Sequence, residues 1–308
     1  MAKILVTGSE GTLGTPLVRE LRRRGHEVWG CDLQHQADEQ YIRADVSSYR
    51  QLERVFEQDY DFVCHLAAEF GRINGEEYYD TLWQTNVIGT RNILEWQHKC
   101  GFKLIFASSS EIYGDKHADI LTEDIPLYAS ITQQNDYAVT KWVNEIQCMN
   151  FEKRFGVPIV RLRFFNAYGP GEHYHHYRSV VCLFCYRALH DLPYTVYRDY
   201  HRVFMYIDDF IPTVANAVDK FVPGEVYNIG GRDYRSVEEL SNIILDYLGS
   251  DDSKIAYLPK DLHNVQNKRP DITKAMQAFG HDPKTTLEEG VRRTIEWMRL
   301  VYADTVRH

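Results

Sequence analysis

Strand-like and helix-like segments alternate along the first half of this chain, and that alternation limits the folds open to it. Short apolar runs lie at 3–7, 27–32, 41–45, 61–68, 103–109 and 158–166, and amphipathic stretches lie between them at 12–24, 47–58, 78–99 and 135–155. Apolar strands joined by helical crossovers form a parallel sheet that helices cover on both faces. The sequence therefore predicts an α/β fold with a doubly wound parallel sheet and right-handed crossovers.

The pattern becomes less regular after Asn166, where an aromatic and histidine-rich stretch, YGPGEHYHHYRS, begins a mixture of short strands and helices. We expect residues 1–166 to form one domain, with a segment near 203–222 returning to it, and residues 167–308 to form a smaller α/β lobe. Ligands of open α/β sheets bind outside the carboxyl ends of the strands. The predicted site is therefore a cleft between the two parts.

Charge and cysteine content exclude several classes of function. A net charge of −9 argues against a surface that binds nucleic acid or an anionic membrane. No apolar run approaches the length of a membrane span, and the first residues do not resemble a signal peptide. The six cysteines lie mostly in apolar segments, which predicts reduced thiols and a cytoplasmic protein. Cys182 and Cys185 have no second ligand pair, so we interpret them as small buried residues on one helix face.

A glycine-rich turn, VTGSEGTLG, joins the first strand to the first helix. Gly8, Gly11 and Gly14 permit a tight turn and let backbone N–H groups approach a pyrophosphate at the helix N-terminus. Asp32 ends the second strand, where a carboxylate accepts hydrogen bonds from a ribose and repels a 2′-phosphate. Together these features predict a Rossmann-type dinucleotide site that prefers NAD to NADP.

Two further segments carry polar groups that suit catalysis. The run FASSSEIYGD begins as a buried strand and ends in three serines and Glu111, whose burial without partners would be costly. Tyr137 and Lys141 are four residues apart on an expected helix and so share one face. An ammonium beside a phenol favours the phenolate and lowers the pKa of the tyrosine. An ordinary polar loop and surface packing are the alternative interpretations.

With these segments in order, the sequence resembles the extended short-chain dehydrogenase/reductase family, in its NAD-dependent nucleotide-sugar epimerase/dehydratase branch. The resemblance runs essentially end to end. It rests on TGSEGTLG, Asp32, ADV at 44–46, HLAA at 65–68, NVIGT at 86–90, SSSEIYG, Tyr137-x-x-x-Lys141, RFFNAYGPG at 163–171, YIDD at 206–209, YNIGG at 227–231 and KRPDITKA at 268–275.

The resemblance implies a role for each matching position. Tyr137 is the base that deprotonates a sugar hydroxyl, Ser109 hydrogen-bonds the same hydroxyl, and Lys141 holds the nicotinamide ribose. Implied cofactor contacts come from Gly8, Gly11, Thr12, Leu13, Gly14, Asp32, Asp45, Val46, Leu66, Ala67, Ala68 and Asn86, with Asp45 and Val46 beside the adenine. Implied substrate contacts come from Ser110, Asn166, Arg178, Arg202 and Arg269, the last two on the nucleotide diphosphate.

The family chemistry begins with hydride transfer from sugar C4 to tightly held NAD, which gives a 4-keto sugar. Glu111 follows the serines in the Ser/Thr-x-Glu-x-Tyr-Gly pattern of dehydratases and decarboxylases, so 4,6-dehydration is the favoured outcome. A 4-epimerase or a UDP-glucuronate-type decarboxylase are the alternatives, and Glu111 as a structural cap is another. A non-catalytic NAD-binding sensor is disfavoured, because Ser109, Tyr137 and Lys141 are all present.

Two expectations concern partners and ligands. The family implies a homodimer in which the helices near 78–99 and 135–155 form a four-helix contact, with Leu82, Val87, Ile88, Val139, Trp142 and Ile146 as apolar candidates. His173, His175 and His176 show no carboxylate–histidine spacing, so we expect no metal and interpret the stretch as a polar lid over the sugar.

Overall fold

The computed structural model describes residues 1–116, 119–259, 265 and 267–303. Within this part of the chain, seven parallel strands form one sheet in the order β11-β6-β5-β4-β1-β2-β3. The strands are β1 Lys3–Thr7, β2 Glu27–Asp32, β3 Tyr41–Arg43, β4 Phe62–His65, β5 Lys103–Ser109, β6 Ile159–Phe164 and β11 Val226–Ile229. The predicted doubly wound parallel sheet is confirmed.

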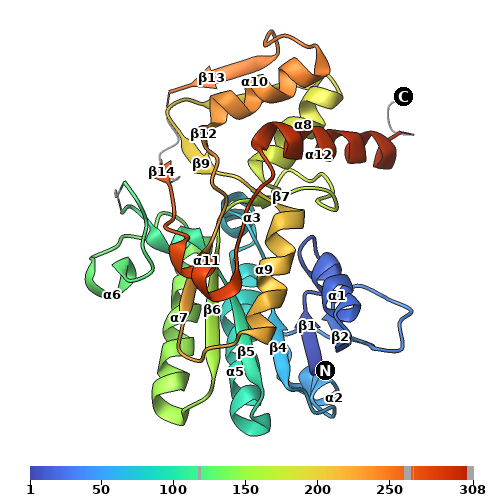
Figure 1. The fold of residues 1–308 in the computed structure, drawn as a ribbon, viewed down its shortest axis with the longest axis vertical. Coiled ribbons are helices and arrows are strands. Elements are labelled where there is room, and N and C mark those ends of the chain that lie inside the picture. Colours follow the sequence, from blue (N-terminus) through green and yellow to red (C-terminus); the bar gives the residue numbers. More distant parts are fainter. Residues whose placement is uncertain (117–118, 260–264, 266, 304–308) are drawn as a thin grey trace.

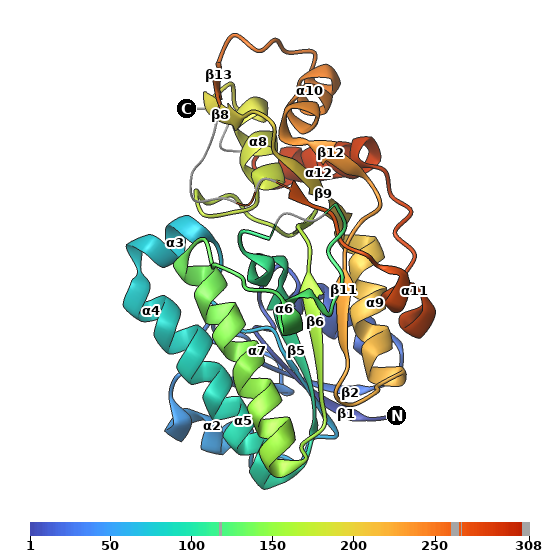
Figure 2. The ribbon, with the colours of Figure 1, turned by 90° about the vertical axis from the view of Figure 1, so that its left-hand side faces the viewer.

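Helices cover both faces of the sheet (Figures 1 and 2). One face carries α2 Tyr49–Val55, α5 Gly89–Cys100 and α7 Asp136–Phe155, and the other carries α1 Gly14–Arg23, α9 Ile207–Asp219 and α11 Thr273–Phe279. Neighbouring strand residues serve opposite faces: Ile4 packs in the core under α1 and α9, whereas Leu5 packs in the core under α2, α5 and α7. The near-continuous apolar strands are therefore buried on both sides.

The helix expected over 78–99 is divided in the structure. It consists of α4 Tyr79–Trp83, a π-helical segment η1 Gln84–Ile88, and α5, and it follows α3 Arg72–Glu77. Asn86 lies in the π-helical segment, where its amide donates to Glu69 O at 3.0 Å and to Thr140 Oγ1 at 3.0 Å. Single π-helical turns inside α-helices often occur at functional sites. Here the turn ties the loop after β4 to α7.

The smaller lobe lies above the carboxyl ends of the strands (Figures 1 and 2). Its small sheets pair β8 Tyr194–Tyr197 with β13 Ile255–Leu258, and β9 His201–Val203 with β12 Tyr234–Ser236 and β14 Asn267–Lys268. Its helices are α8 Val180–Leu189, α10 Val237–Leu248 and α12 Leu287–Val301. The short elements β7 Ala167–Tyr168, β10 Met205–Tyr206, η2 Ser110–Tyr113 and α6 Ile125–Tyr128 complete the described structure.

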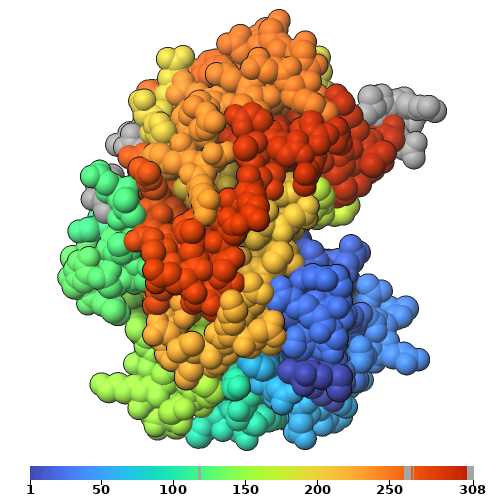
Figure 3. Space-filling view, in the orientation of Figure 1, coloured from blue at the N-terminus to red at the C-terminus, as the bar shows by residue number. Residues whose placement is uncertain are grey.

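The sheet draws on residues well beyond Asn166. Helix α9 covers one face, and β11 pairs with β6 at the sheet edge. Strand β11, Val226–Ile229, therefore lies outside the segment 203–222 that was expected to return. A single apolar cluster also joins both parts, since Ile4 of the sheet, Phe184 of α8 and Ile295 of α12 belong to it. The space-filling view in Figure 3 shows the two parts in broad contact.

Two expectations from the sequence concern the cysteines, which should be reduced, and the helices, which should not span a membrane. All six cysteines are free thiols, and five of them are buried. Cys182 and Cys185 lie buried in α8, where burial raises the pKa of each thiol, so they are packing residues as interpreted. None of the helices described is long and apolar enough to cross a membrane.

Candidate active site

A cavity of about 600 Å³ lies between the sheet and the smaller lobe, at the carboxyl ends of the strands. The predicted residues that line it are Gly8, Gly11, Thr12, Leu13, Gly14, Asp32, Asp45, Val46, Leu66, Ala67, Ala68, Ser109, Ser110, Glu111, Tyr137, Lys141, Asn166, Arg178 and Arg202. Asn86 and Arg269 are not among the described residues of its wall. One cavity thus gathers residues that are dispersed from Gly8 to Arg202.

The glycine turn forms the floor of one end of the cavity. Gly8 has a φ of +73°, and a Cβ added to it would lie 2.7 Å from the backbone nitrogen of Ala67. A Cβ added to Gly14 would lie 2.0 Å from the carbonyl oxygen of Gly8. Neither position can hold a side chain without moving the backbone, so the turn stays open at the start of α1. This geometry fits the pyrophosphate of a dinucleotide.

Asp32 stands at the end of β2 beside this turn. Its carboxylate accepts hydrogen bonds from Glu10 N at 3.0 Å and from Leu33 N at 2.7 Å. These bonds hold the turn against β2 and leave the side chain partly exposed on the cavity wall. Asp45 and Val46 lie further along the same wall, after β3.

A buried histidine supports the loop on which Leu66, Ala67 and Ala68 lie. His65 Nδ1 is 2.7 Å from Thr7 Oγ1 and its Nε2 is 3.2 Å from Thr90 Oγ1. Thr7 Oγ1 in turn accepts a hydrogen bond from Ala67 N at 3.3 Å. Asn86 holds the same loop through Glu69 instead of facing the cavity. His65 and Asn86 therefore support the loop that forms this part of the cavity wall, without lining the cavity themselves.

The catalytic candidates meet at the opposite end of the cavity. Strand β5 delivers Ser109, whose hydroxyl caps η2 by accepting a hydrogen bond from Glu111 N at 3.2 Å. Asn135 caps α7 by accepting from Ala138 N at 2.8 Å, and Tyr137 and Lys141 lie in the next turns of that helix. Lys141 Nζ donates to Ala107 O at 2.9 Å and lies 5.8 Å from the centre of the Tyr137 ring.

Burial governs the proton affinities of these groups. It raises the pKa of the Tyr137 phenol, against the effect of a hydrogen bond with Ser109 that lowers it. Burial also lowers the pKa of Lys141 to about 8, although Cys148 and Glu145 act to raise it. The expected lowering of the Tyr137 pKa by Lys141 is not found in this structure: burial raises that pKa, and the Lys141 ammonium bonds to the backbone carbonyl of Ala107.

Glu111 has a partner that sequence reasoning missed. Its carboxylate forms a salt bridge with the ammonium of Lys268, whose side chain is 3% exposed on β14. Burial opposes the charge on Glu111, but Lys268, together with Arg202 and Asn135, outweighs this effect, so the pKa of Glu111 is lowered. Asn135 Nδ2 also lies 3.5 Å from its second oxygen. Lys268 directly precedes Arg269 in the KRPD motif, and Lys268 lines the cavity.

The basic side chains expected to contact substrate take different positions. Arg202 is buried on β9 and lines the cavity, close enough to lower the pKa of Glu111 further. Arg178 lies with its guanidinium 4.5 Å from the ring centre of Phe70, on the wall of the cavity. Arg269 instead lies 5.5 Å from the ring centre of Tyr234. Asn166 lines the cavity and donates to Val203 O at 3.0 Å.

The histidine-rich stretch contributes Glu172, Tyr177 and Arg178 to the cavity wall, whereas His173, His175 and His176 are not among the described residues of that wall. Tyr177 donates its hydroxyl hydrogen to Glu77 of α3, and His173 packs 5.2 Å from Trp297 of α12. No group of three His, Cys, Asp or Glu side chains that could hold a metal occurs within residues 1–116, 119–259, 265 and 267–303. Wall residues that sequence reasoning missed include Glu69, Phe70, Arg72, Glu172, Tyr177 and Lys268.

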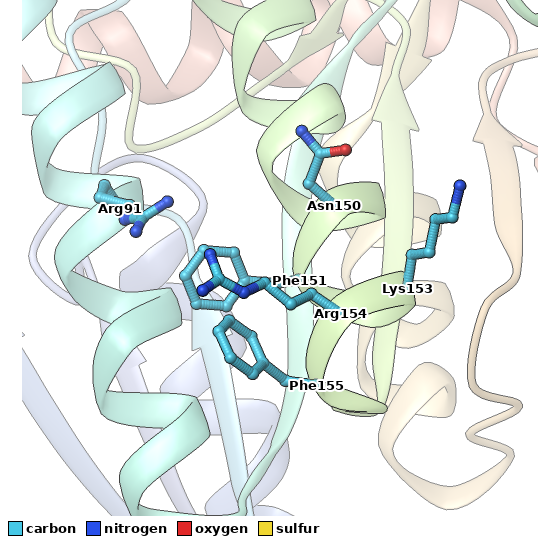
Figure 4. Close-up of a pocket in the computed structure, with 6 residues that line it drawn as sticks. All are labelled: Arg91, Asn150, Phe151, Lys153, Arg154 and Phe155. Atoms are coloured by element: carbon cyan, nitrogen blue, oxygen red, sulfur yellow. The ribbon is translucent and has the colours of Figure 1, made fainter.

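A second hollow lies away from this site, between α5 and α7 (Figure 4). Its lining residues are Arg91, Asn150, Phe151, Lys153, Arg154 and Phe155. Arg91 lies 4.6 Å from the ring centre of Phe151, and its guanidinium also pairs with Glu95 at 2.6 Å. It holds none of the predicted site residues, and we assign no ligand to it.

Comparison with known proteins places the chain among nucleotide-sugar enzymes. The model of the NAD-dependent epimerase/dehydratase family matches residues 4–230. The UDP-N-acetyl-α-D-glucosaminuronate decarboxylase of Bacillus cytotoxicus is 32% identical over 98% of this chain and 99% of that protein.

Two solved structures share the fold over nearly their whole length. The UDP-glucose 4-epimerase of Thermotoga maritima with UDP-glucose has a TM-score of 0.87 and 27% identity, over 97% of this chain and 99% of that one. The UDP-glucuronic acid 4-epimerase of Bacillus cereus, with UDP-glucuronic acid and NAD, has a TM-score of 0.84 and 25% identity, over 97% and 100%. The relatives thus share a scaffold and differ in reaction.

Proposed function

Because this chain belongs to the NAD-dependent epimerase/dehydratase family, we propose that it oxidises C4 of a nucleotide-diphosphate hexuronate and then decarboxylates the 4-keto sugar. Bound NAD supplies the hydride acceptor, and later the hydride donor, of this sequence. The glycine turn, Asp32 and Asp45 would hold its adenosine end and pyrophosphate, and Lys141 its nicotinamide ribose. The reduced cysteines support a cytoplasmic setting.

Tyr137 and Ser109 serve the first step. Tyr137 takes the proton of the C4 hydroxyl, and Ser109 orients that hydroxyl through a hydrogen bond. Burial raises the pKa of the Tyr137 phenol, and the hydrogen bond with Ser109 favours the phenolate that this step requires. The product is a ketone at C4, which lies two carbons from the C6 carboxylate.

The salt bridge of Glu111 with Lys268 is the observation that carries the choice of second step. Dehydration needs an acid to protonate the departing C6 hydroxyl, and a lowered pKa makes Glu111 a poor acid near neutral pH. Decarboxylation needs no such acid, because the C5–C6 electron pair moves to the C4 ketone as carbon dioxide leaves. Lys268, whose pKa burial lowers, is suited to return a proton to C5.

The cations beside Glu111 also suit a uronate. Lys268 and Arg202 both line the cavity, and both lower the pKa of Glu111. Cationic side chains in the cavity wall complement an anionic group such as a C6 carboxylate. The Bacillus cytotoxicus relative, a uronate decarboxylase by its name, supports the same choice. Dehydration remains the second candidate, since Glu111 does line the cavity.

Product analysis tests the proposal directly. Purified protein is incubated with NAD and one nucleotide sugar at a time: UDP-glucuronate, UDP-N-acetylglucosaminuronate, UDP-glucose or dTDP-glucose. The masses of the products are measured by mass spectrometry. We expect loss of carbon dioxide from a uronate. Loss of water from a neutral hexose would establish dehydration instead, and an unchanged mass with inverted C4 would establish epimerisation.

The variant Lys268→Met tests the assignment of the second step. We expect NADH to form at a normal rate and to persist after carbon dioxide has left, with protonation at C5 and formation of the final product slowed by about a hundredfold or more. Lys274→Met is the matched control, because Lys274 pairs with Glu225 outside the cavity wall. If Lys268→Met forms the final product at the normal rate, Lys268 is not the group that returns the proton to C5.

A further inference from the structure

A buried ion pair lies directly behind the catalytic end of the cavity. Arg163 of β6 binds Glu145 of α7 through two hydrogen bonds, Nε to Oε1 and Nη2 to Oε2, each 2.9 Å long. Their side chains are 2% and 1% exposed. Neither residue belongs to the cavity wall as far as the chain is described, so neither is positioned to touch a ligand there.

Stability alone does not account for this pair. The cost of removing two charges from water offsets their attraction, so buried ion pairs are often no better than apolar side chains of the same volume. Such pairs are better explained where their directional bonds select one arrangement of the surrounding elements. The elements that meet here are those that carry the catalytic candidates.

On one side, the pair joins α7 to β5. Glu145 lies four residues after Lys141 and so shares its face of α7. Its carboxylate accepts a hydrogen bond from Ser108 Oγ at 2.5 Å, and Ser108 immediately precedes Ser109 at the end of β5. One carboxylate thus links the helix of Tyr137 and Lys141 to the strand of Ser109.

On the other side, the pair anchors the turn that carries Glu111. Arg163 Nη1 donates to Tyr113 Oη at 2.9 Å, at the end of η2, and to Glu123 O at 2.7 Å. Tyr113 donates its own hydrogen to Asn228 Oδ1 of β11 at 2.7 Å. A chain of directional bonds therefore runs from α7 through β5 and β6 to η2 and β11.

We propose that Glu145 and Arg163 are positioning residues, which hold Tyr137 and Lys141 of α7 in register with Ser109 and Glu111 for hydride removal at C4. This inference rests on the proposed catalytic roles of those four residues. A misplacement of about 1 Å in such a constellation costs up to about a hundredfold in rate. Loss of the pair should therefore lower kcat and leave KM and the affinity for NAD nearly unchanged.

Glu145 also has an electrostatic effect that a purely mechanical support would lack. Burial lowers the pKa of Lys141 to about 8, and Glu145 raises it. Four other titratable groups lie around Lys141 and Glu145. His65 of β4 is neutral because burial lowers its pKa to about 3, and Cys148 and Tyr137 of α7 are neutral because burial raises the pKa of each. The fourth group, Arg163, is paired with Glu145. Removing the Glu145 charge should thus release the Lys141 proton at lower pH.

The test compares Glu145→Gln with Glu152→Gln. Glu152 and Arg161 form a second pair between the same helix and strand, 3.6 Å apart and two turns further along α7. With UDP-glucuronate as probe, we expect Glu145→Gln to slow single-turnover NADH formation by about ten- to a hundredfold and to move the alkaline limb of kcat to lower pH. Glu152→Gln should do neither.

A second measurement needs no substrate or cofactor. The pH titration of the Lys141 ammonium is followed by NMR in protein labelled with ¹⁵N in its lysine side chains, the signal being identified by its loss in Lys141→Arg. We expect the midpoint of the Lys141 titration to lie at lower pH in Glu145→Gln and to be unchanged in Glu152→Gln. Equal midpoints in both variants, or an unchanged rate of NADH formation, would overturn the inference.

Two further results also have a defined meaning: a Glu145→Gln variant that does not fold, and an unchanged protein that forms no NADH. If Glu145→Gln does not fold, Glu145→Asp replaces it; this variant keeps the charge but shortens the reach, so it should slow NADH formation without moving the Lys141 midpoint. If the unchanged protein forms no NADH with UDP-glucuronate or with any other nucleotide sugar used in the product analysis, the proposed function fails, and the Lys141 titration alone tests the inference about the pair.

Discussion

His65 shows how a single residue couples the fold of this protein to pH. Burial lowers its pKa to about 3, and its two ring nitrogens contact Thr7 and Thr90. In the unfolded chain a histidine titrates near about 6.5. Between these two pKa values the unfolded state binds a proton that the folded state lacks. The contribution of His65 to the free energy of unfolding is therefore fully present above the unfolded-state pKa and is lost as the pH falls toward the folded-state pKa.

We therefore expect the free energy of unfolding to decrease by about 1.4 kcal/mol per pH unit from this residue alone, between about pH 6 and pH 4. Urea unfolding over that range measures the slope. His65→Gln should flatten it, whereas His98→Gln, which removes an exposed imidazole, is the matched control. An equal slope in the unchanged protein and in His65→Gln would mean that other groups dominate the acid sensitivity.

Helix α7 shows how one element serves both stability and the site. Asn135 caps it through Ala138 N, and the amide of the same side chain reaches toward Glu111. Replacing an asparagine cap with alanine costs about 1 kcal/mol. We expect Asn135→Ala to lose that free energy of unfolding and also to slow turnover.

Asn135→Ser separates the two roles of this cap. Serine retains an oxygen that can accept from the helix, but it lacks the amide that faces Glu111. Stability by thermal or urea unfolding should therefore stay near that of the unchanged protein, while turnover falls as in Asn135→Ala. Full activity of both variants would show that Asn135 serves only the helix.

Helices α4, α5 and α7 form one flank of the whole molecule, where a homodimer contact is expected (Figure 2). Of the apolar candidates named for a dimer contact, Leu82 and Val87 are buried, whereas Ile88 and Ile146 are exposed on this flank. The hollow of Figure 4 lies between α5 and α7. We expect a homodimer that buries Ile146, as a four-helix contact would.

Light scattering at micromolar concentration measures this state. Ile146→Asp should shift the mass to that of a monomer, because it would place a charge in an apolar contact. Leu127→Asp is the control, since Leu127 is an exposed apolar residue on α6, away from these helices. A monomeric mass for the unchanged protein would remove the four-helix proposal.

Much of the fold and part of the site could be predicted from particular segments of sequence. The run KLIFASS matches β5 residue for residue, and the stretch from Asn135 to Phe155 is α7 with its cap. The helix over 78–99 was predicted without its π-helical turn, because that turn depends on Asn86 reaching Glu69 and Thr140. Periodicity does not record contacts between elements that are distant in sequence.

The parallel sheet, the glycine turn and the shared face of Tyr137 and Lys141 could all be predicted from the sequence. These features depend on residues within a few positions of one another, so strand alternation, steric freedom and helical spacing express them directly. Two ion pairs became apparent from the three-dimensional structure alone: Lys268 with Glu111, 157 residues away, and Arg163 with Glu145. The first pair forms because Lys268 of β14 reaches Glu111 of η2, and the second because β6 packs against β5 and α7; no local pattern contains that information.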